Sequence, residues 1–169
     1  MIRIPYEFWL APYEEAVELG KNIDWMPILR NGAEFTYLIT TVATGHLDDR
    51  WIDTSRKISY LLNLPCIEEA GFGRVRNDLL RRLCFLAELN TSDLISWAEI
   101  LISRGADVNY SSKRISCIEA AASSQMNDEL LLLLLKFGAK VPRSWKSIAA
   151  NCERQSTKKI LESAEKVKS

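Results

Sequence analysis

The sequence is poor in the residues that most often bind metals or carry chemistry. Histidine occurs once, as His46, and the four cysteines lie far apart with no C-x-x-C pair: Cys66, Cys84, Cys117 and Cys152. A zinc site is not expected from this pattern. Widely spaced cysteines in a helical cytosolic protein act as small, reduced, apolar residues. We therefore expect no metal, no cofactor and no disulfide.

Sets of catalytic residues are also missing. A serine–histidine or cysteine–histidine pair could be built only on His46, which is more typical of a ring at a turn between two helices. Three acidic pairs occur, and the members of each pair are adjacent in the sequence: Glu14-Glu15, Asp48-Asp49 and Glu68-Glu69. Neighbours on a helix point in different directions, so no pair forms a general acid and base by itself. The sequence predicts a non-enzyme, and a hydrolase built on His46 is the weakest alternative.

Long apolar runs are absent too. The longest, Leu130–Leu135, has six leucines, far short of the roughly 18 residues of a transmembrane segment. Leucine on every face is typical of a helix buried between neighbours. Acidic residues Glu7, Glu14 and Glu15 interrupt the segment that a signal peptide would need. We expect a cytoplasmic protein that does not contact a membrane.

The chain has no net charge, with 22 basic and 22 acidic residues. This balance argues against general nucleic-acid binding, which needs a basic surface. The charge is uneven along the chain: residues 1–70 hold 11 acidic and 6 basic residues, and residues 126–169 hold 5 acidic and 9 basic residues. The gradient either arises by chance or steers a charged partner.

What the sequence does contain is a repeated segment. An apolar run ends in Arg104-Gly105-Ala106-Asp107-Val108-Asn109, and a second run, Leu130–Lys136, ends in Phe137-Gly138-Ala139-Lys140-Val141. Three residue pairs are 33 positions apart: Gly105 and Gly138, Cys84 and Cys117, and Ala87 and Ala120. Glycine after a helix favours a left-handed C-terminal cap. Units this small cannot bury their own apolar faces, so they must stack.

A period of 33 residues resembles that of ankyrin repeats, and the resemblance covers roughly residues 80–162. The family's inner helix opens with threonine-proline-leucine-histidine-x-alanine-alanine, and the matching run here is Ser116-Cys117-Ile118-Glu119-Ala120-Ala121-Ala122. Ser116 can still cap the helix, and Ala121 and Ala122 let neighbouring helices approach. Cys117 and Glu119 replace the proline and the histidine, so the array is a degenerate one.

The resemblance implies an all-α fold, a stacked helix-pair solenoid of ankyrin-like repeats with a diverged helical N-terminal part. We expect a single domain over residues 1-169, with diverged N-terminal helices over 1-70 and recognisable repeats over 71-169. The expected helices are Tyr13–Lys21, Trp25–Arg30, Phe35–Thr44, Arg56–Leu64, Asn77–Leu89, Leu94–Ser103, Ser116–Ser123, Asp128–Phe137, Ser144–Ala150 and Thr157–Ala164. Phe35–Thr44 has a β-branched content that also suits a strand. Asp24 can cap the helix that follows it, and Asp53-Thr54-Ser55 offers a capped start for Arg56–Leu64. Cys66–Val75 is expected to form an enlarged turn.

In ankyrin arrays the partner lies against the turn tips and the inner helices. The matching tips here each combine aromatic and basic residues, which gives the predicted partner-binding set: Phe72, Arg74, Arg76, Tyr110, Lys113, Arg114, Arg143 and Trp145. Tyrosine, tryptophan and arginine dominate interface energies. The alternative is that Trp145 packs on the preceding helix and that the cations are only solvated.

The resemblance and the missing catalytic set favour a protein–protein interaction module with one specific protein partner. A compact chain of this kind resembles bacterial immunity proteins, which bind and neutralise a cognate toxin or effector domain. The alternative is an ankyrin adaptor or scaffold that regulates a host-cell process. No nucleic acid and no membrane is expected as a partner.

Overall fold

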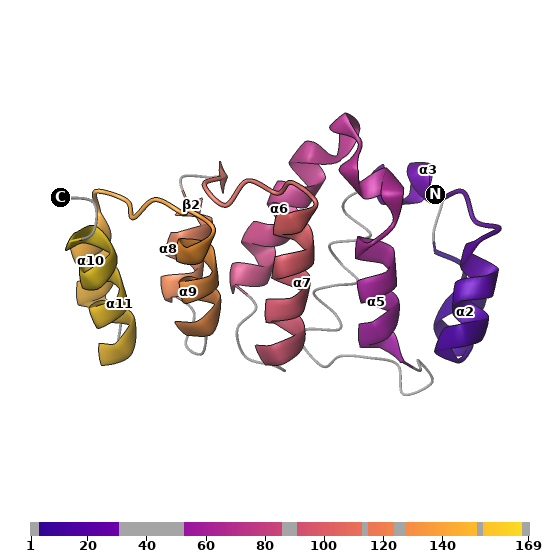
Figure 1. The fold of residues 1–169 in the computed structure, drawn as a ribbon, viewed down its shortest axis with the longest axis horizontal. Helices are drawn as coiled ribbons and strands as arrows, with labels where there is room; N and C mark the ends of the chain where they lie inside the picture. Colours follow the sequence, from indigo (N-terminus) through magenta and orange to yellow (C-terminus); the bar gives the residue numbers. More distant parts are fainter. Residues whose placement is uncertain are drawn as a thin grey trace.

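The computed structural model describes residues 4–30, 53–85, 91–112, 115–123, 128–151 and 154–166. Within these residues the chain forms ten α-helices, two 3₁₀ helices and one two-stranded hairpin, which confirms the prediction of a mostly helical fold. The helices stand side by side in an elongated row (Figure 1). The expected helix Phe35–Thr44 and His46 lie outside the described residues.

Among the described residues, the N-terminal part of the row contains the helices α1 (Tyr6–Leu10), α2 (Tyr13–Gly20), α3 (Trp25–Arg30) and α5 (Thr54–Leu62). Asp24 caps α3 as predicted, since its Oδ1 accepts a hydrogen bond from Met26 N–H at 3.2 Å. The predicted start at Arg56, capped by Asp53-Thr54-Ser55, is wrong: α5 begins at Thr54, and Asp53 makes no side-chain hydrogen bond to it. Its side chain accepts instead from Tyr13 N–H at 3.0 Å and so caps α2, while the Asp53 backbone has a left-handed φ of 52°.

A buried lysine joins α5 to α1. Lys57 is fully buried, and its Nζ donates to the carbonyl oxygens of Trp9 at 2.8 Å and Ala11 at 2.6 Å. Burial lowers the pKa of Lys57, while the nearby Asp53 carboxylate acts in the opposite direction. These carbonyls end α1 and need donors, so the ammonium group satisfies backbone acceptors in the interior.

The rest of the row contains these elements: η1 (Pro65–Glu68), η2 (Ala70–Phe72), α6 (Gly73–Phe85), α7 (Thr91–Ser103), β1 (Ser111–Ser112), β2 (Ile115–Ser116), α8 (Cys117–Ser123), α9 (Asp128–Lys136), α10 (Trp145–Asn151) and α11 (Gln155–Lys166). Helices α6, α8 and α10 pack in sequence as one row, and α5, α7, α9 and α11 pack as a second row. The two rows contact each other through the pairs α6 and α7, α8 and α9, and α10 and α11. The expected enlarged turn over Cys66–Val75 is instead two 3₁₀ turns and the start of α6.

The glycines at the ends of α7 and α9 confirm the predicted left-handed caps. Gly105 has φ 89° and Gly138 has φ 85°. Both helices close with the same pair of backbone bonds, a Schellman motif. The bonds are Gly105 N–H to Ile102 O at 2.9 Å and Ala106 N–H to Leu101 O at 2.9 Å, and Gly138 N–H to Leu135 O at 3.0 Å and Ala139 N–H to Leu134 O at 2.9 Å.

The two cysteines of the second pair lie at different places in their helices. Cys84 lies one residue before the end of α6, whereas Cys117 is the first residue of α8, because α6 has 13 residues and α8 has 7. Cys84 and Cys117 are both buried and free, and burial followed by the neighbouring Cys117 thiol raises the pKa of Cys84. The two thiols are nevertheless neighbours across the packed helices α6 and α8. Ala87, of the third pair, lies outside the described residues.

Candidate protein-binding surface

The first predicted tip is not an exposed surface. Phe72 has no exposed side-chain area and Arg76 is 9% exposed, so the prediction that these two side chains face a partner is wrong. The physical reason is local: η2 turns Phe72 into the core, and α6 begins at Gly73 rather than at Asn77. Residues that would flank an open turn are thus part of a helical packing surface.

Arg76 instead connects three backbone segments. Its Nη1 donates to the carbonyl oxygen of Ile67 in η1. A Cβ added at Gly105 would lie 3.7 Å from Arg76 Nη2, and one at Gly73 would lie 3.9 Å from it. The guanidinium therefore lies between η1, the start of α6 and the turn after α7, which is a structural position.

Arg74 and Tyr110 are brought together on the surface by a third residue. The Arg74 side chain is 85% exposed, and its Nε lies 3.9 Å from Asp78 Oδ2. Tyr110 Oη donates to Asp78 Oδ1 at 3.1 Å. Asp78 was not among the predicted site residues, because the helix was expected to begin at Asn77 and the i,i+4 relation to Arg74 arises only with α6 starting at Gly73.

The second tip is the β1–β2 hairpin that follows Tyr110. Ser111 pairs with Ser116, and Ser112 pairs with Ile115. Ser116 also caps α8 as predicted: its Oγ accepts from Glu119 N–H at 3.3 Å, and Glu119 Oε2 accepts from Ser116 N–H at 2.8 Å, a capping box. Lys113 and Arg114 lie outside the described residues.

At the third tip the two predicted residues separate. Arg143 is exposed, but Trp145 is only 9% exposed, so the prediction of Trp145 as a contact residue is wrong and its packing alternative is right. Trp145 is the first residue of α10, and α10 packs on α8. A large ring at that point is needed for the contact between neighbouring helices.

Two asparagine side chains form hydrogen bonds between successive elements of the stack: Asn77 joins α6 to the turn after α7, and Asn109 joins that turn to the turn after α9. Asn77 Oδ1 accepts from Asp107 N–H at 2.8 Å, and Asn109 Oδ1 accepts from Lys140 N–H at 2.7 Å. Asp107 and Lys140 occupy the same place, two residues after their cap glycines. The described tip surface, defined as Arg74, Tyr110 and Arg143, is therefore carried by the start of α6 and by the turns after α7 and α9, which these hydrogen bonds join.

Glu119 links two units at the position where the family motif has histidine. Its Oε1 accepts from Ser144 Oγ at 3.3 Å, just before α10. Farther along the stack, Asp128 at the start of α9 accepts from Thr157 Oγ1 at 2.6 Å and pairs with Arg154 Nη2 at 2.5 Å. Burial alone would raise the pKa of Asp128, but hydrogen bonds from Ser156 and Thr157 together with the Arg154 charge lower it.

Comparison of the chain with protein-family models, with curated proteins and with solved structures found no match. In the part of the chain that the structure describes, no group of three or more His, Cys, Asp and Glu side chains could hold a metal ion. None of the described helices combines the length and the apolar character that crossing a membrane requires.

Proposed function

We propose that the chain is an ankyrin-like protein-binding module and that it acts as an immunity protein, binding and neutralising one cognate toxin or effector domain. The observation that carries the proposal is the tip surface. Exposed Arg74 lies at the start of α6, and half-buried Tyr110 and exposed Arg143 lie in the turns after α7 and after α9. Hydrogen bonds join α6 to the first of these turns and the first turn to the second. Arginine and tyrosine are the residues on which interface energies most depend.

Support for the ankyrin-like fold comes from the backbone. Two helix pairs end in the same Schellman motif, 33 residues apart, and successive pairs stack in two rows. In such a stack each unit contacts only its neighbours, which leaves the turn side available along the whole row. Basic groups on that side fit a partner whose contacting surface is acidic.

The test begins with capture of the partner by the full chain and its identification by mass spectrometry. The captured protein is then expressed alone and together with the chain. We expect it to stop growth alone and to be tolerated in the presence of the chain. A captured partner that is harmless alone but whose activity changes on binding would favour the adaptor function instead.

The same assay tests the surface. Arg74→Glu combined with Arg143→Glu should slow association, flatten its salt dependence and abolish protection, because exposed charges act mainly on the association rate. The control is Lys21→Glu, a charge reversal at the C-terminal cap of the distant helix α2, where the side chain is 61% exposed. Equal protection by both variants would contradict the tip surface.

A further inference from the structure

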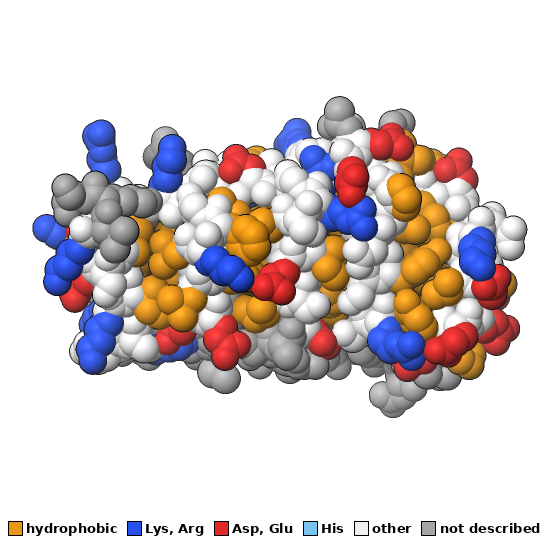
Figure 2. All heavy atoms as spheres, in the orientation of Figure 1, with side chains coloured by type: hydrophobic (Ala, Val, Ile, Leu, Met, Phe, Trp, Pro, Cys, Tyr) orange, Lys and Arg blue, Asp and Glu red, His pale blue; other side chains and the backbone are white. Residues whose placement is uncertain are grey.

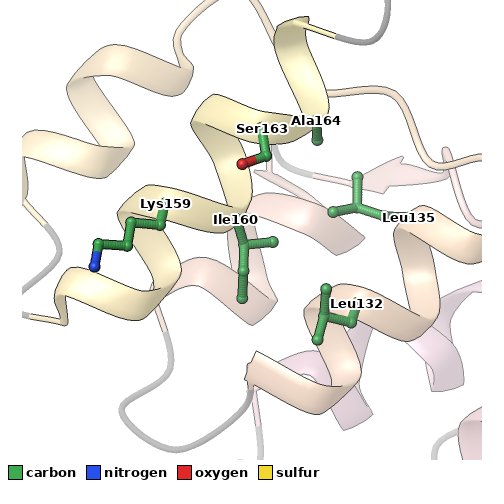
Figure 3. Close-up of a pocket in the computed structure, with 6 residues that line it drawn as sticks. All are labelled: Leu132, Leu135, Lys159, Ile160, Ser163 and Ala164. Atoms are coloured by element: carbon green, nitrogen blue, oxygen red, sulfur yellow. The ribbon is translucent and has the colours of Figure 1, made fainter.

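A second surface lies between α9 and α11. The two helices pack side by side, and a groove of about 420 Å³ between them is lined by Leu132, Leu135, Lys159, Ile160, Ser163 and Ala164. Figure 3 shows the three large apolar side chains directed into the space between the helices, with Lys159 at its edge. The volume falls within the range of binding pockets.

The groove results from an unusual exposure pattern in the six-leucine run. Leu130, Leu131, Leu133 and Leu134 are buried, but Leu132 is 52% exposed. Opposite the run, α11 supplies the small side chains Ser163 and Ala164, which leave the space open. The two helices are joined at their N-terminal ends by Asp128, which accepts a hydrogen bond from Thr157 Oγ1 and forms an ion pair with Arg154. The width of the groove is thus set by bonds between the helices.

We infer that this groove binds an acidic amphipathic helix of a protein partner. The apolar lining residues are spaced by one turn on each helix, 132 to 135 and 160 to 164, which suits the i, i+3 or i+4 apolar anchors of a helix lying in a groove. The inference rests on the proposed function as a protein-binding module, but it concerns a surface separate from Arg74, Tyr110 and Arg143.

The charges beside the groove decide the sign of the partner. Lys159 lies at one edge, and Lys136 is exposed one turn after Leu132. Glu162 and Glu165 of α11 lie two and five positions after Ile160 and so point away from the groove on a helix of 3.6 residues per turn. Glu129 is exposed one turn before Leu132, on the same side of α9 as Lys136. Among the described residues, these two lysines thus outnumber the one carboxylate beside the groove. Figure 2 shows basic side chains around this end of the row and acidic ones gathered low at the other end.

The chain's own acidic helix is a poorer occupant. Helix α2 carries Glu14, Glu15 and Glu18, but Leu19 is its one exposed large apolar side chain. A helix seated in the groove needs at least two apolar anchors on one face. A helix of another protein, with two or three apolar anchors and flanking carboxylates, fits the groove better than a second copy of this chain.

The test uses a displayed library of helical peptides selected against the full chain, so it does not depend on capturing the natural partner. We expect the enriched peptides to carry apolar residues at i, i+3 or i+4 and i+7, flanked by Asp or Glu. An enriched peptide is then synthesised with a fluorescein label, and its Kd is measured by anisotropy. Failure here would leave the capture and growth experiment on the tip surface unaffected.

Two variants assign the peptide to the groove. Ser163→Trp places a large ring in the open space and should weaken binding at least about tenfold. Lys159→Glu changes an exposed charge without affecting packing, and it should weaken binding several-fold and reduce its salt dependence. Leu19→Ser, on α2, is the matched control and should bind like the parent. Circular dichroism and urea midpoints establish that all three variants are folded.

Several results would overturn the inference. Enriched peptides without acidic residues, or peptides that bind both groove variants like the parent, would remove the groove as their site. Sedimentation showing a dimer of the parent that Ser163→Trp abolishes would assign the groove to a second copy. Binding of the parent to vesicles of anionic lipid, lost in Ser163→Trp, would assign it to a membrane surface.

Discussion

The two cap glycines offer a matched pair of substitutions. Gly105 and Gly138 have nearly equal φ values, 89° and 85°, but different surroundings. A Cβ at Gly105 would meet Arg76 Nη2 at 3.7 Å, an ordinary contact distance, whereas a Cβ at Gly138 would meet nothing within 4 Å. Any L-residue other than glycine in this region costs roughly 1–2 kcal/mol. Gly105→Ala and Gly138→Ala should therefore both destabilise the protein by about that amount, with no added penalty at Gly105.

The assay is urea unfolding followed by circular dichroism, with free energies compared at constant m-value. A loss of 1 kcal/mol corresponds to about 2–4 °C in Tm for a chain of this size. Asparagine tolerates the left-handed region better than alanine, so Gly105→Asn should recover part of the loss. Gly105→Val adds β-branching and should cost more than Gly105→Ala. A neutral Gly105→Ala would refute the left-handed cap, and a much larger loss at Gly105 than at Gly138 would show that the guanidinium cannot accommodate a methyl group.

Three further predictions concern the contacts between elements. Lys57→Met leaves two buried carbonyl oxygens without their donor and should destabilise by about 1–3 kcal/mol or more, whereas Lys21→Met on the surface should cost almost nothing in the same urea assay; equal effects would contradict the buried role of Lys57. Because the folded-state pKa of Asp128 is lowered, the stability it contributes is present above the ordinary aspartate pKa of about 4 and is lost as the pH falls through the lower folded-state value. Urea midpoints measured from pH 5 downward should therefore fall less steeply in Asp128→Asn than in the parent. An unchanged pH dependence would contradict the contribution of the Asp128 carboxylate to stability. Ala121→Leu should overpack the buried face of α8 and cost roughly 1–3 kcal/mol, while Ala150→Leu at an exposed position of α10 should be close to neutral; the reverse order would mean that the assignment of inner faces is wrong.

The features predicted correctly from the sequence were those fixed by local chemistry. A glycine after an apolar run specifies a helix end wherever the helix lies, and a serine three residues before a glutamate specifies a helix start. Gly105, Gly138 and Ser116 all behave in this way. Asp24 also caps its helix as expected, through a hydrogen bond from the N–H of Met26, two residues later in the sequence.

Whether the large side chains near helix starts are buried or exposed could not be predicted in this way. Phe72, Arg76 and Trp145 combine bulk with aromatic or basic character, which suits an interface and a core equally well. Their burial depends on where η2 ends and where α6 and α10 begin, which is decided by packing against other helices. Lys57 was overlooked for a different reason: its i,i+4 relation to Leu61 placed it on the buried face, but a charged residue is normally expected at the surface.

Two asparagines join successive elements of the stack through their side chains. Asn77 in α6 accepts from the N–H of Asp107, and Asn109 in the turn after α7 accepts from the N–H of Lys140 and donates to Gly138 O at 3.4 Å. During synthesis from the N-terminus, each acceptor therefore leaves the ribosome before the donor that it will serve. Removing a helix pair from either end would break one of these links and would also expose the apolar face on which that pair packed. The asparagines therefore align neighbouring pairs, while the buried apolar faces determine how many pairs the stack can lose.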